Sequence, residues 1–483
     1  MKPTRQRLPA LLASVLVSAC AVGPDYQRPS APEPAAYKEV PQAGATWLPA
    51  APADLLDRGP WWRLFDDPEL DALMVRIEVS NQNVAAAVAS YRQARALVAQ
   101  QRAALFPSLG LTGGASRSGG GRSSAQGSGG NSFQAGLDAS WVPDVWGRLA
   151  RTVESAQASA EASQADLAAA RLSAQAELAT DYFQLRDADA ELDLLRRTVD
   201  GYQRALTITR NRYNAGIAAK TDVLQAQTQL ASTQADLVSL QGQRAQLEHA
   251  IAMLVGKTPA DFALAPGAWK RNVPAVPLGI PSALLERRPD IAAAERAVAA
   301  ANAQIGIERA AYYPNLSLTA SYGSAAERFG DLFKASSMLW SLGLSATQTL
   351  FDAGATRAAV QGAEAARDAA IARYRQAVIA AFQGVEDQLA STRSLAEQAD
   401  FRREASEAAD QTEVQLLNRY TQGLVAYTDV VTAQATALSA RRTLSALIAS
   451  RQATAVALIQ ALGGGWHVGL SEAAEAASAA SQP

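Results

Sequence analysis

The segment Phe106–Thr112 reads Phe-Pro-Ser-Leu-Gly-Leu-Thr, and it returns 207 residues later as Tyr-Pro-Asn-Leu-Ser-Leu-Thr at Tyr313–Thr319. A second motif, Arg-Tyr-x-x-Gly, begins at Arg212 and returns at Arg419 with the same offset. An offset this long is far outside the roughly 20–50 residues of a solenoid repeat. The chain is therefore predicted to contain two copies of one fold, related by pseudo-symmetry.

The residues that follow each proline motif alternate with a period of two. In the second copy, Met338–Ala346 places apolar side chains at every other position, with small or polar residues at most of the others. Strands of about ten residues with one apolar face are typical of transmembrane β-strands. We predict one hairpin at about 108–142 and another at about 315–350. A small soluble hairpin is the alternative, and aromatic residues near the hairpin ends, such as Trp146 and Tyr313, argue against it.

A proline-free stretch follows each hairpin, from Gly147 to Gly216 and from Gly354 to Gly423. Each stretch is predicted to form one long helix. The spacing of apolar residues after Ile371 alternates between three and four, which is the pattern of a coiled coil or bundle. Return helices are expected at about 221–255 and about 428–462. The predicted fold class is a membrane β-barrel combined with a long α-helical coiled-coil barrel, built from duplicated half-subunits.

The N-terminus reads as a secretory signal peptide over residues 1–19. Cys20 is the only cysteine in the chain and directly follows Val17-Ser18-Ala19. This arrangement resembles a bacterial lipobox, which implies lipidation of Cys20 and sorting to the outer membrane; an ordinary cleavage site beside an incidental cysteine is the alternative. The expected boundaries after the signal are a lipid-anchored extended strap at 20–60, the first repeat at 61–256, a linker at 257–282, the second repeat at 283–466 and a disordered tail at 467–483.

Composition argues against several classes of protein. The net charge of −2 provides no basic surface for nucleic acid. His249 and His467 lie far apart without neighbouring metal ligands, and no phosphate-binding loop or nucleophile motif is present. We therefore expect no cofactor, no metal and no enzymatic activity. No uninterrupted run of about 18 apolar residues occurs, which argues against a transmembrane helix.

The number of strands predicts how many chains assemble. Four strands cannot close a barrel, and an open strand edge is not tolerated in lipid. Two chains would supply eight strands, which enclose an interior filled by side chains, whereas three would supply twelve and leave an aqueous bore. A homotrimer that shares one twelve-stranded barrel is the expected assembly.

Several motifs resemble those of the outer membrane efflux protein family, in particular the lipoprotein (NodT-type) branch of its TolC-like factors. They are Cys20–Pro29 (CAVGPDYQRP), Trp61–Pro68 (WWRLFDDP), Arg288-Pro289-Asp290 and the doubled Arg-Tyr-x-x-Gly. The resemblance implies a trimeric outer-membrane channel with a helical tunnel in the periplasm. It also implies a tripartite pump with a periplasmic adaptor (membrane fusion protein) and an inner-membrane transporter of the resistance-nodulation-division (RND) type. A type I secretion duct and a structural lipoprotein spacer are the alternatives.

The doubled turn is the predicted functional site. Glycine there supplies the positive φ that ends a helix. Thr221 and Thr428 are expected to cap the return helices, with a carboxylate in the first turn of each. Because three copies repeat any residue that faces the axis, such a carboxylate could form a negative ring at the periplasmic entrance; plain capping is the alternative. The resemblance favours Asp429 as the ring residue, with Asp222, Arg212, Arg419, Tyr213 and Tyr420 as latches.

Two further features concern the same turns. Thr432 lies one helical turn after Asp429, at a position where relatives can carry a second aspartate, so a single acidic ring is expected. The exposed ends of the hairpins are the expected docking surface for the adaptor, and they consist of Gly216, Ile217, Gly423 and Leu424.

Overall fold

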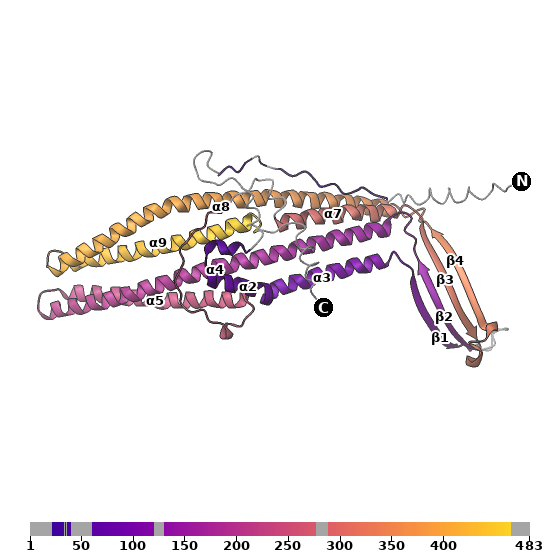
Figure 1. Ribbon diagram of the computed structural model, residues 1–483, viewed down its shortest axis with the longest axis horizontal. Coiled ribbons are helices and arrows are strands. Elements are labelled where there is room, and N and C mark those ends of the chain that lie inside the picture. The colour runs from indigo at the N-terminus through magenta and orange to yellow at the C-terminus, as the bar shows by residue number, and fades with distance from the viewer. Residues whose placement is uncertain are drawn as a thin grey trace. The chain divides into compact units, whose positions relative to one another are not determined.

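The computed structural model describes residues 22–32, 34, 36–39, 60–119, 130–276 and 288–464 (Figure 1). The predicted signal peptide, the lipidation of Cys20 and the predicted tail lie outside the described residues. The chain divides into two compact units. Unit 1 contains residues 1–31, 90–164 and 293–375, and unit 2 contains residues 32–89, 165–292 and 376–483.

The elements follow one another in two parallel series. The first series is η2 (Trp61–Phe65), α2 (Pro68–Ser80), α3 (Gln82–Ala103), β1 (Ser108–Arg117), β2 (Asn131–Trp141), α4 (Arg148–Asn214), α5 (Lys220–Leu254) and η3 (Pro259–Asp261). The second series is α7 (Pro289–Ala310), β3 (Asn315–Ala326), η5 (Phe329–Asp331), η6 (Ala335–Ser337), β4 (Met338–Thr347), α8 (Ala355–Thr421) and α9 (Tyr427–Ala461). The α4 and α8 helices both contain 67 residues, and α5 and α9 both contain 35. The described chain is therefore mostly helical and internally duplicated.

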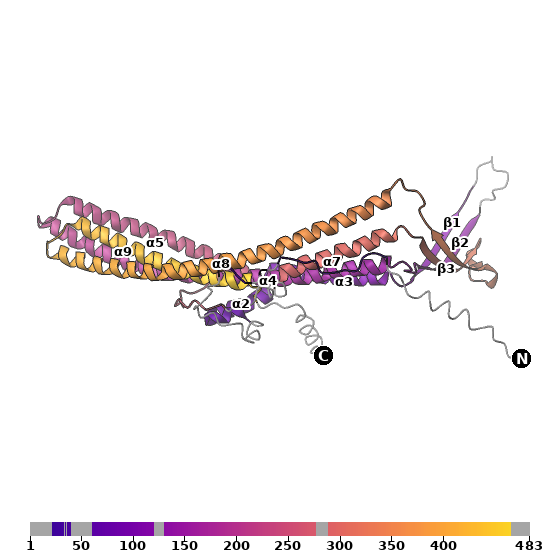
Figure 2. The ribbon, with the colours of Figure 1, turned by 90° about the horizontal axis from the view of Figure 1, so that it is seen from above.

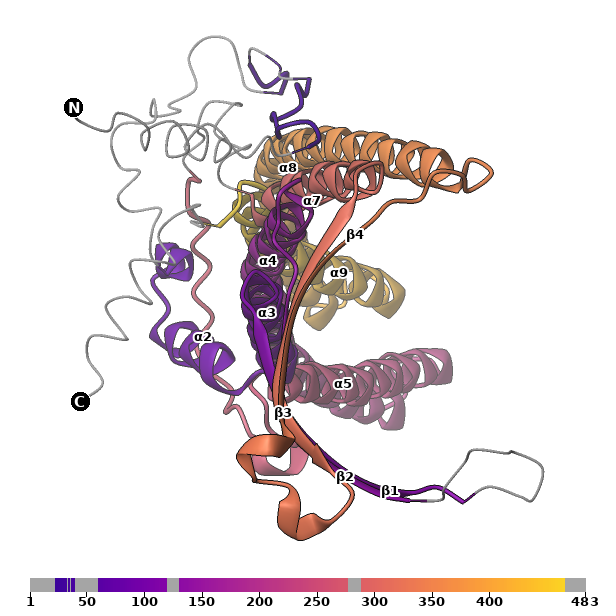
Figure 3. The same ribbon diagram turned by 90° about the vertical axis from the view of Figure 1, so that its right-hand side faces the viewer.

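Unit 1 contains the four strands, which form one antiparallel sheet in the order β1-β2-β3-β4. The two hairpins are joined by pairing between β2 and β3, in which Leu137 lies opposite Tyr322. Figure 3 shows the four strands side by side in a curved sheet. Among the described strands, β1 and β4 each pair on one side only, so the sheet has two open edges.

The pairing register gives the sheet two different faces. One row across all four strands consists of Leu111, Leu137, Tyr322 and Trp340. All four side chains are exposed, although they are large and apolar or aromatic. Residues one position along the strands point to the other face, where Thr112 donates a hydrogen bond to Asp138 (2.9 Å) and the hydroxyls of Ser321 and Ser341 lie 2.8 Å apart. The sheet is therefore amphipathic.

The N-terminal strap is held against the helices of unit 1 by polar contacts. The amide of Val22 donates to the carbonyl of Trp146 (3.2 Å), and Arg151 pairs with Asp25 (2.8 Å). The Tyr26 hydroxyl donates to Glu295 (3.0 Å). Residues 22–26 of the strap are thus fixed to unit 1.

Unit 2 contains two long helical hairpins, formed by α4 with α5 and by α8 with α9. Figure 2 shows them side by side with their turns at the same end. Apolar residues from α4, α5 and α9 form a common core; the fully or largely buried members are Ala188, Leu192, Leu195, Leu240 and Leu438. These residues lie three and four positions apart on α4, as expected for packing between helices.

A buried arginine fixes the segment that follows α5 in unit 2. The Arg186 side chain is completely buried and pairs with Asp189 (2.8 Å) and Glu69 (2.5 Å). It also donates to the carbonyl of Ala265 (2.9 Å). Arg244 pairs with the same Asp189 (2.8 Å). The network therefore joins α2, α4, α5 and the start of the linker, and the sequence did not predict it.

The expectation that no helix could span a membrane needs a correction. Among the described helices, α9 alone is long and apolar enough to pass a test of length and composition. Its apolar residues have another explanation, because 44% of the apolar stretch is buried inside the protein. The same helix carries Arg441, which pairs with Asp410 and Glu413 (both 2.8 Å). We therefore regard α9 as a core helix of unit 2.

Candidate functional site

The turns of the two hairpins have the same backbone geometry. Gly216 and Gly423 have φ values of +73° and +80°. At the first turn, the amide of Ile217 donates to the carbonyl of Arg212 (2.9 Å), and at the second, Leu424 donates to Arg419 at the same distance. These bonds close the long helices in the manner of a Schellman motif. The doubled glycine therefore has a structural reason in both repeats.

The predicted threonine caps are wrong. The return helices begin at Lys220 and Tyr427, and their N-cap residues are Ala219 and Ala426, which make no side-chain capping hydrogen bond. Thr221 therefore lies inside its helix, as does its counterpart Thr428. The carboxylates do lie in the first turns, as expected for groups attracted by the positive end of a helix dipole.

The two Arg-Tyr pairs have different environments. Arg212 lies over the ring of Tyr420 (4.7 Å to the centroid) and donates to its backbone carbonyl (3.1 Å). Tyr420 is only 5% exposed, whereas its counterpart Tyr213 is 43% exposed. Arg419 is also exposed. The structure thus joins one arginine and one tyrosine from different repeats and leaves the other two on the surface.

The acidic residues are not bonded to these latch candidates. In the part of the chain that the structure describes, no side-chain hydrogen bond or ion pair joins Asp222 or Asp429 to either arginine or either tyrosine. Asp429 is exposed, and Asp222 is half-buried. The hydroxyl of Thr432 donates to the carbonyl of Thr428 (2.9 Å).

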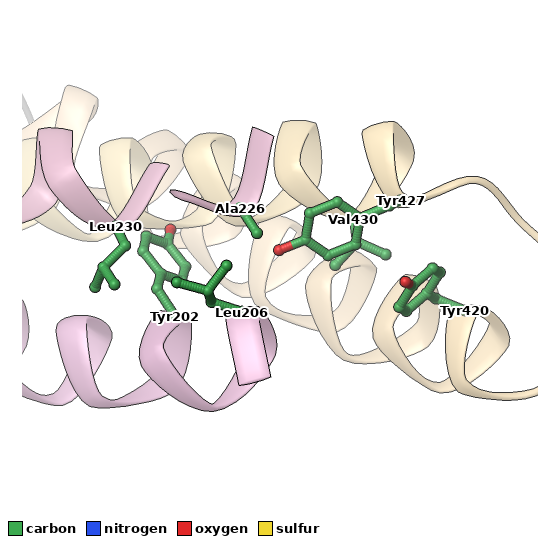
Figure 4. Close-up of a cluster of buried hydrophobic side chains, with 7 residues drawn as sticks. All are labelled: Tyr202, Leu206, Ala226, Leu230, Tyr420, Tyr427 and Val430. Atoms are coloured by element: carbon green, nitrogen blue, oxygen red, sulfur yellow. The ribbon is translucent and has the colours of Figure 1, made fainter. Parts of the chain in front are cut away.

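A hydrophobic cluster beside the turns was not predicted. Figure 4 shows this cluster, which contains Tyr202, Leu206, Ala226, Leu230, Tyr420, Tyr427 and Val430. The Tyr420 and Tyr427 rings lie 5.1 Å apart. A spacing of three and four along α4, from Val199 through Tyr202 to Leu206, was the available signal. The cluster packs the α8–α9 turn of the second repeat against α4 and α5 of the first repeat.

Tyr427 makes this cluster sensitive to alkaline pH. Burial, with additional effects from Tyr420 and Asp222, raises the pKa of Tyr427 to about 12. A raised pKa means that the folded protein favours the neutral phenol, so the stabilisation is complete below pH 10 and is lost as the pH rises through about 12. We expect Tyr427→Phe to reduce the loss of helical structure between these pH values, as measured by circular dichroism. The exposed Tyr213 provides the control, and an equal reduction in Tyr213→Phe would contradict this assignment.

An amphipathic sheet with an exposed apolar face, combined with long helical hairpins, indicates a membrane-associated protein. The family model described as "Outer membrane efflux protein" matches residues 73–257 and again residues 280–464. The chain therefore belongs to the outer membrane efflux protein family, and the two matches are themselves 207 residues apart.

Proteins with efflux functions resemble the chain over almost its whole length. The probable efflux pump outer membrane protein TtgC of Pseudomonas putida is 31% identical over 481 residues, which cover 98% of this chain and 99% of TtgC. The cation efflux system protein CusC of Escherichia coli K12 is 30% identical over 463 residues, or 95% and 99% of the two chains. The solved structure of the outer-membrane channel OprN has a TM-score of 0.82 and 31% identity, covering 92% of this chain and all of OprN. The function of the protein is accordingly efflux at the outer membrane.

Proposed function

We propose that three copies of the chain close a twelve-stranded barrel in the outer membrane, and that their helices form a tunnel in the periplasm. The observation that carries this proposal is the single four-stranded sheet with an apolar face and two open edges. Lipid cannot satisfy an open edge, so each β1 needs the β4 of another copy. Twelve strands leave a passage, whereas eight would be filled by side chains.

The channel is the passive exit duct of a tripartite pump. It receives drugs or other small molecules from an inner-membrane RND-type transporter through a periplasmic adaptor. Lipidation at Cys20 anchors the chain in outer-membrane lipid, and the fixed strap after residue 22 supports an anchor close to unit 1. A type I secretion duct is the alternative within the same class, and the efflux functions in the names of TtgC and CusC disfavour it. A structural spacer would have no use for an apolar sheet face.

The turns form the periplasmic gate and the docking surface for the adaptor. Asp429 provides an acidic ring, and Thr432 leaves that ring single. Arg212 and Tyr420 hold the two repeats of a chain together, whereas Asp222, Tyr213 and Arg419 are the remaining latch candidates. Gly216, Ile217, Gly423 and Leu424 present small and apolar groups to the adaptor, and the exposure of Ile217 (68%) and Leu424 (64%) supports this role.

Single-channel recording in planar bilayers tests the duct and its gate. We expect a small conductance that favours cations, because a ring of carboxylates attracts cations and repels anions. Asp429→Asn should lower the cation preference several-fold, and Thr432→Asp should raise it by adding a second ring. Absence of conductance from a folded trimer would contradict the duct. Unchanged selectivity in both variants would leave the duct intact and remove the gate role of Asp429.

A further inference from the structure

The first repeat holds the second through a defined set of side chains near the turns. Tyr420 and Tyr427 of the second repeat are 5% and 3% exposed, because residues of α4 and α5 surround them. Four residues of the first repeat surround the two tyrosines. Three of them are buried, and one of these three has a hydroxyl that interacts with Tyr427; the fourth lies over the ring of Tyr420. We call them the first seat: Tyr202, Thr209, Arg212 and Ala226.

The second repeat carries an equivalent set, which we call the second seat. Its members lie 207 residues further along the chain: Ala409, Leu416, Arg419 and Ala433. Three of these four line a groove of about 420 Å³ between α8 and α9, and Asp429 and Thr432 line the same groove. The fourth, Arg419, is exposed. The positions that hold two tyrosines in the first repeat thus form an open groove in the second.

The residues equivalent to the two buried tyrosines are exposed. Tyr420 corresponds to Tyr213, which is 43% exposed, and Tyr427 corresponds to Lys220, which is also exposed. Val430 is completely buried, whereas its counterpart Val223 is only half-buried. One chain therefore has an open groove at the second seat of its second repeat, and its first repeat has an α4–α5 turn whose equivalent residues are not enclosed.

Lys220 stands at the position equivalent to Tyr427, and its positive charge is complementary to a carboxylate of the groove. In the filled seat, Tyr427 lies close enough to Asp222 for that carboxylate to raise its pKa. The residues at the equivalent positions carry opposite charges: Lys220 lies at the start of α5 in the first repeat, and Asp429 lines the open groove of the second. A lysine needs an anionic partner when it enters a groove, and the groove supplies one.

We propose, building on the trimer described above, that the second seat receives the α4–α5 turn of a second copy of the chain. Lys220 of the partner subunit forms an ion pair with Asp429, and the ring of the partner subunit's Tyr213 lies under Arg419. A surface that is complementary to a different surface of the same chain produces a head-to-tail contact, and the rotation between copies of the trimer proposed above closes such contacts into a ring. The ion pair then weakens the acidic ring of Asp429 in the assembled trimer without abolishing it, so the trimer retains a reduced preference for cations.

A crosslinking experiment on the full-length lipoprotein tests the contact. Lys220→Cys with Asp429→Cys is treated with a short bis-methanethiosulfonate linker and analysed on denaturing gels with and without reductant. We expect covalent dimers and trimers that reductant converts to monomers. The matched control is Asp222→Cys with Tyr427→Cys, which occupies the equivalent positions inside one chain and should give linked monomers, recognised by the added mass of one bridging linker. The two single variants of the test pair should give no trimer.

Native mass spectrometry of the unmodified protein separates the two proposals. A trimer without crosslinks in the test pair, while the control pair links, would overturn the seat and leave the proposed duct in place. A monomer would overturn both. Dimers from Asp429→Cys alone would place these side chains against each other at the axis and would also overturn the seat. A second readout is ion selectivity, because Lys220→Gln should raise the cation preference that Asp429→Asn lowers; no change in Lys220→Gln would contradict the ion pair.

Discussion

Replacement of Arg186 by methionine is expected to lower the free energy of unfolding by about 3–5 kcal/mol, because the buried Asp189 loses one of its two cationic partners and the carbonyl of Ala265 loses its donor. Arg186 is completely buried, and the Asp189 side chain that it contacts is only 4% exposed. Arg244 would still pair with Asp189, but Glu69 and the carbonyl of Ala265 would lose their contacts with Arg186. Urea titration followed by far-UV circular dichroism measures the change.

The same helix offers a matched control. Arg197 also pairs with an aspartate, Asp193 (2.7 Å), but its side chain is 71% exposed. Exposed pairs contribute little to stability, so Arg197→Met should change the free energy of unfolding by no more than about 0.5–1 kcal/mol. Similar losses in Arg186→Met and Arg197→Met would show that the buried network does not stabilise unit 2.

Replacement of Gly256 by alanine should have the second largest effect. Gly256 ends α5 with a φ of +68°, and a Cβ atom there would lie 2.0 Å from the carbonyl oxygen of Ser80. The left-handed conformation costs a non-glycine residue about 1–2 kcal/mol. Forcing the backbone of Ser80 away adds about 1–3 kcal/mol, as for other overpacked sites. A total loss of about 2–5 kcal/mol is expected in the same urea titration.

Gly216 separates the two contributions. Its φ is +73°, but a Cβ atom there would meet no atom within 4 Å. Gly216→Ala should therefore show only the cost of the left-handed conformation. If Gly256→Ala were no more destabilising than Gly216→Ala, close packing against Ser80 would not be the reason for glycine at residue 256.

The sequence predicted the duplicated, largely helical fold because the residues that end its helices and strands act locally. Proline at residues 107 and 314 and glycine at residues 216 and 423 act through backbone geometry, which needs no knowledge of distant residues. The pairing of β2 with β3 was not predicted, because Trp141 and Leu318 are far apart in the sequence. The threonine caps were wrong because each return helix begins one residue before its threonine.

The site was harder to predict than the fold. Arg186 lies in an alanine-rich helix with charged neighbours, so its sequence environment predicts an exposed side chain. Its burial depends on the linker, which is distant in the sequence. The doubled Arg-Tyr motif drew attention to four equivalent side chains, but only burial distinguishes Tyr420 from Tyr213. Lys220 and Tyr427 occupy equivalent positions but differ in chemistry. The sequence alone does not show that Tyr427 is enclosed and Lys220 is exposed, so it gives no reason for the difference.

Fusion of two repeats into one chain allows the contacts between neighbouring repeats of a ring to differ in chemistry. We call each such contact a joint; joints inside a chain alternate with joints between chains. A ring of separate identical repeats would have identical joints, which would all respond alike to the solvent. In the trimer proposed above, the joint inside each chain is sealed by the Tyr427 cluster, whereas the joint between chains ends in Lys220 and Asp429. Added salt screens an ion pair but does not weaken an apolar contact. High ionic strength should therefore loosen alternate joints only, and the two helical hairpins of one chain would stay together.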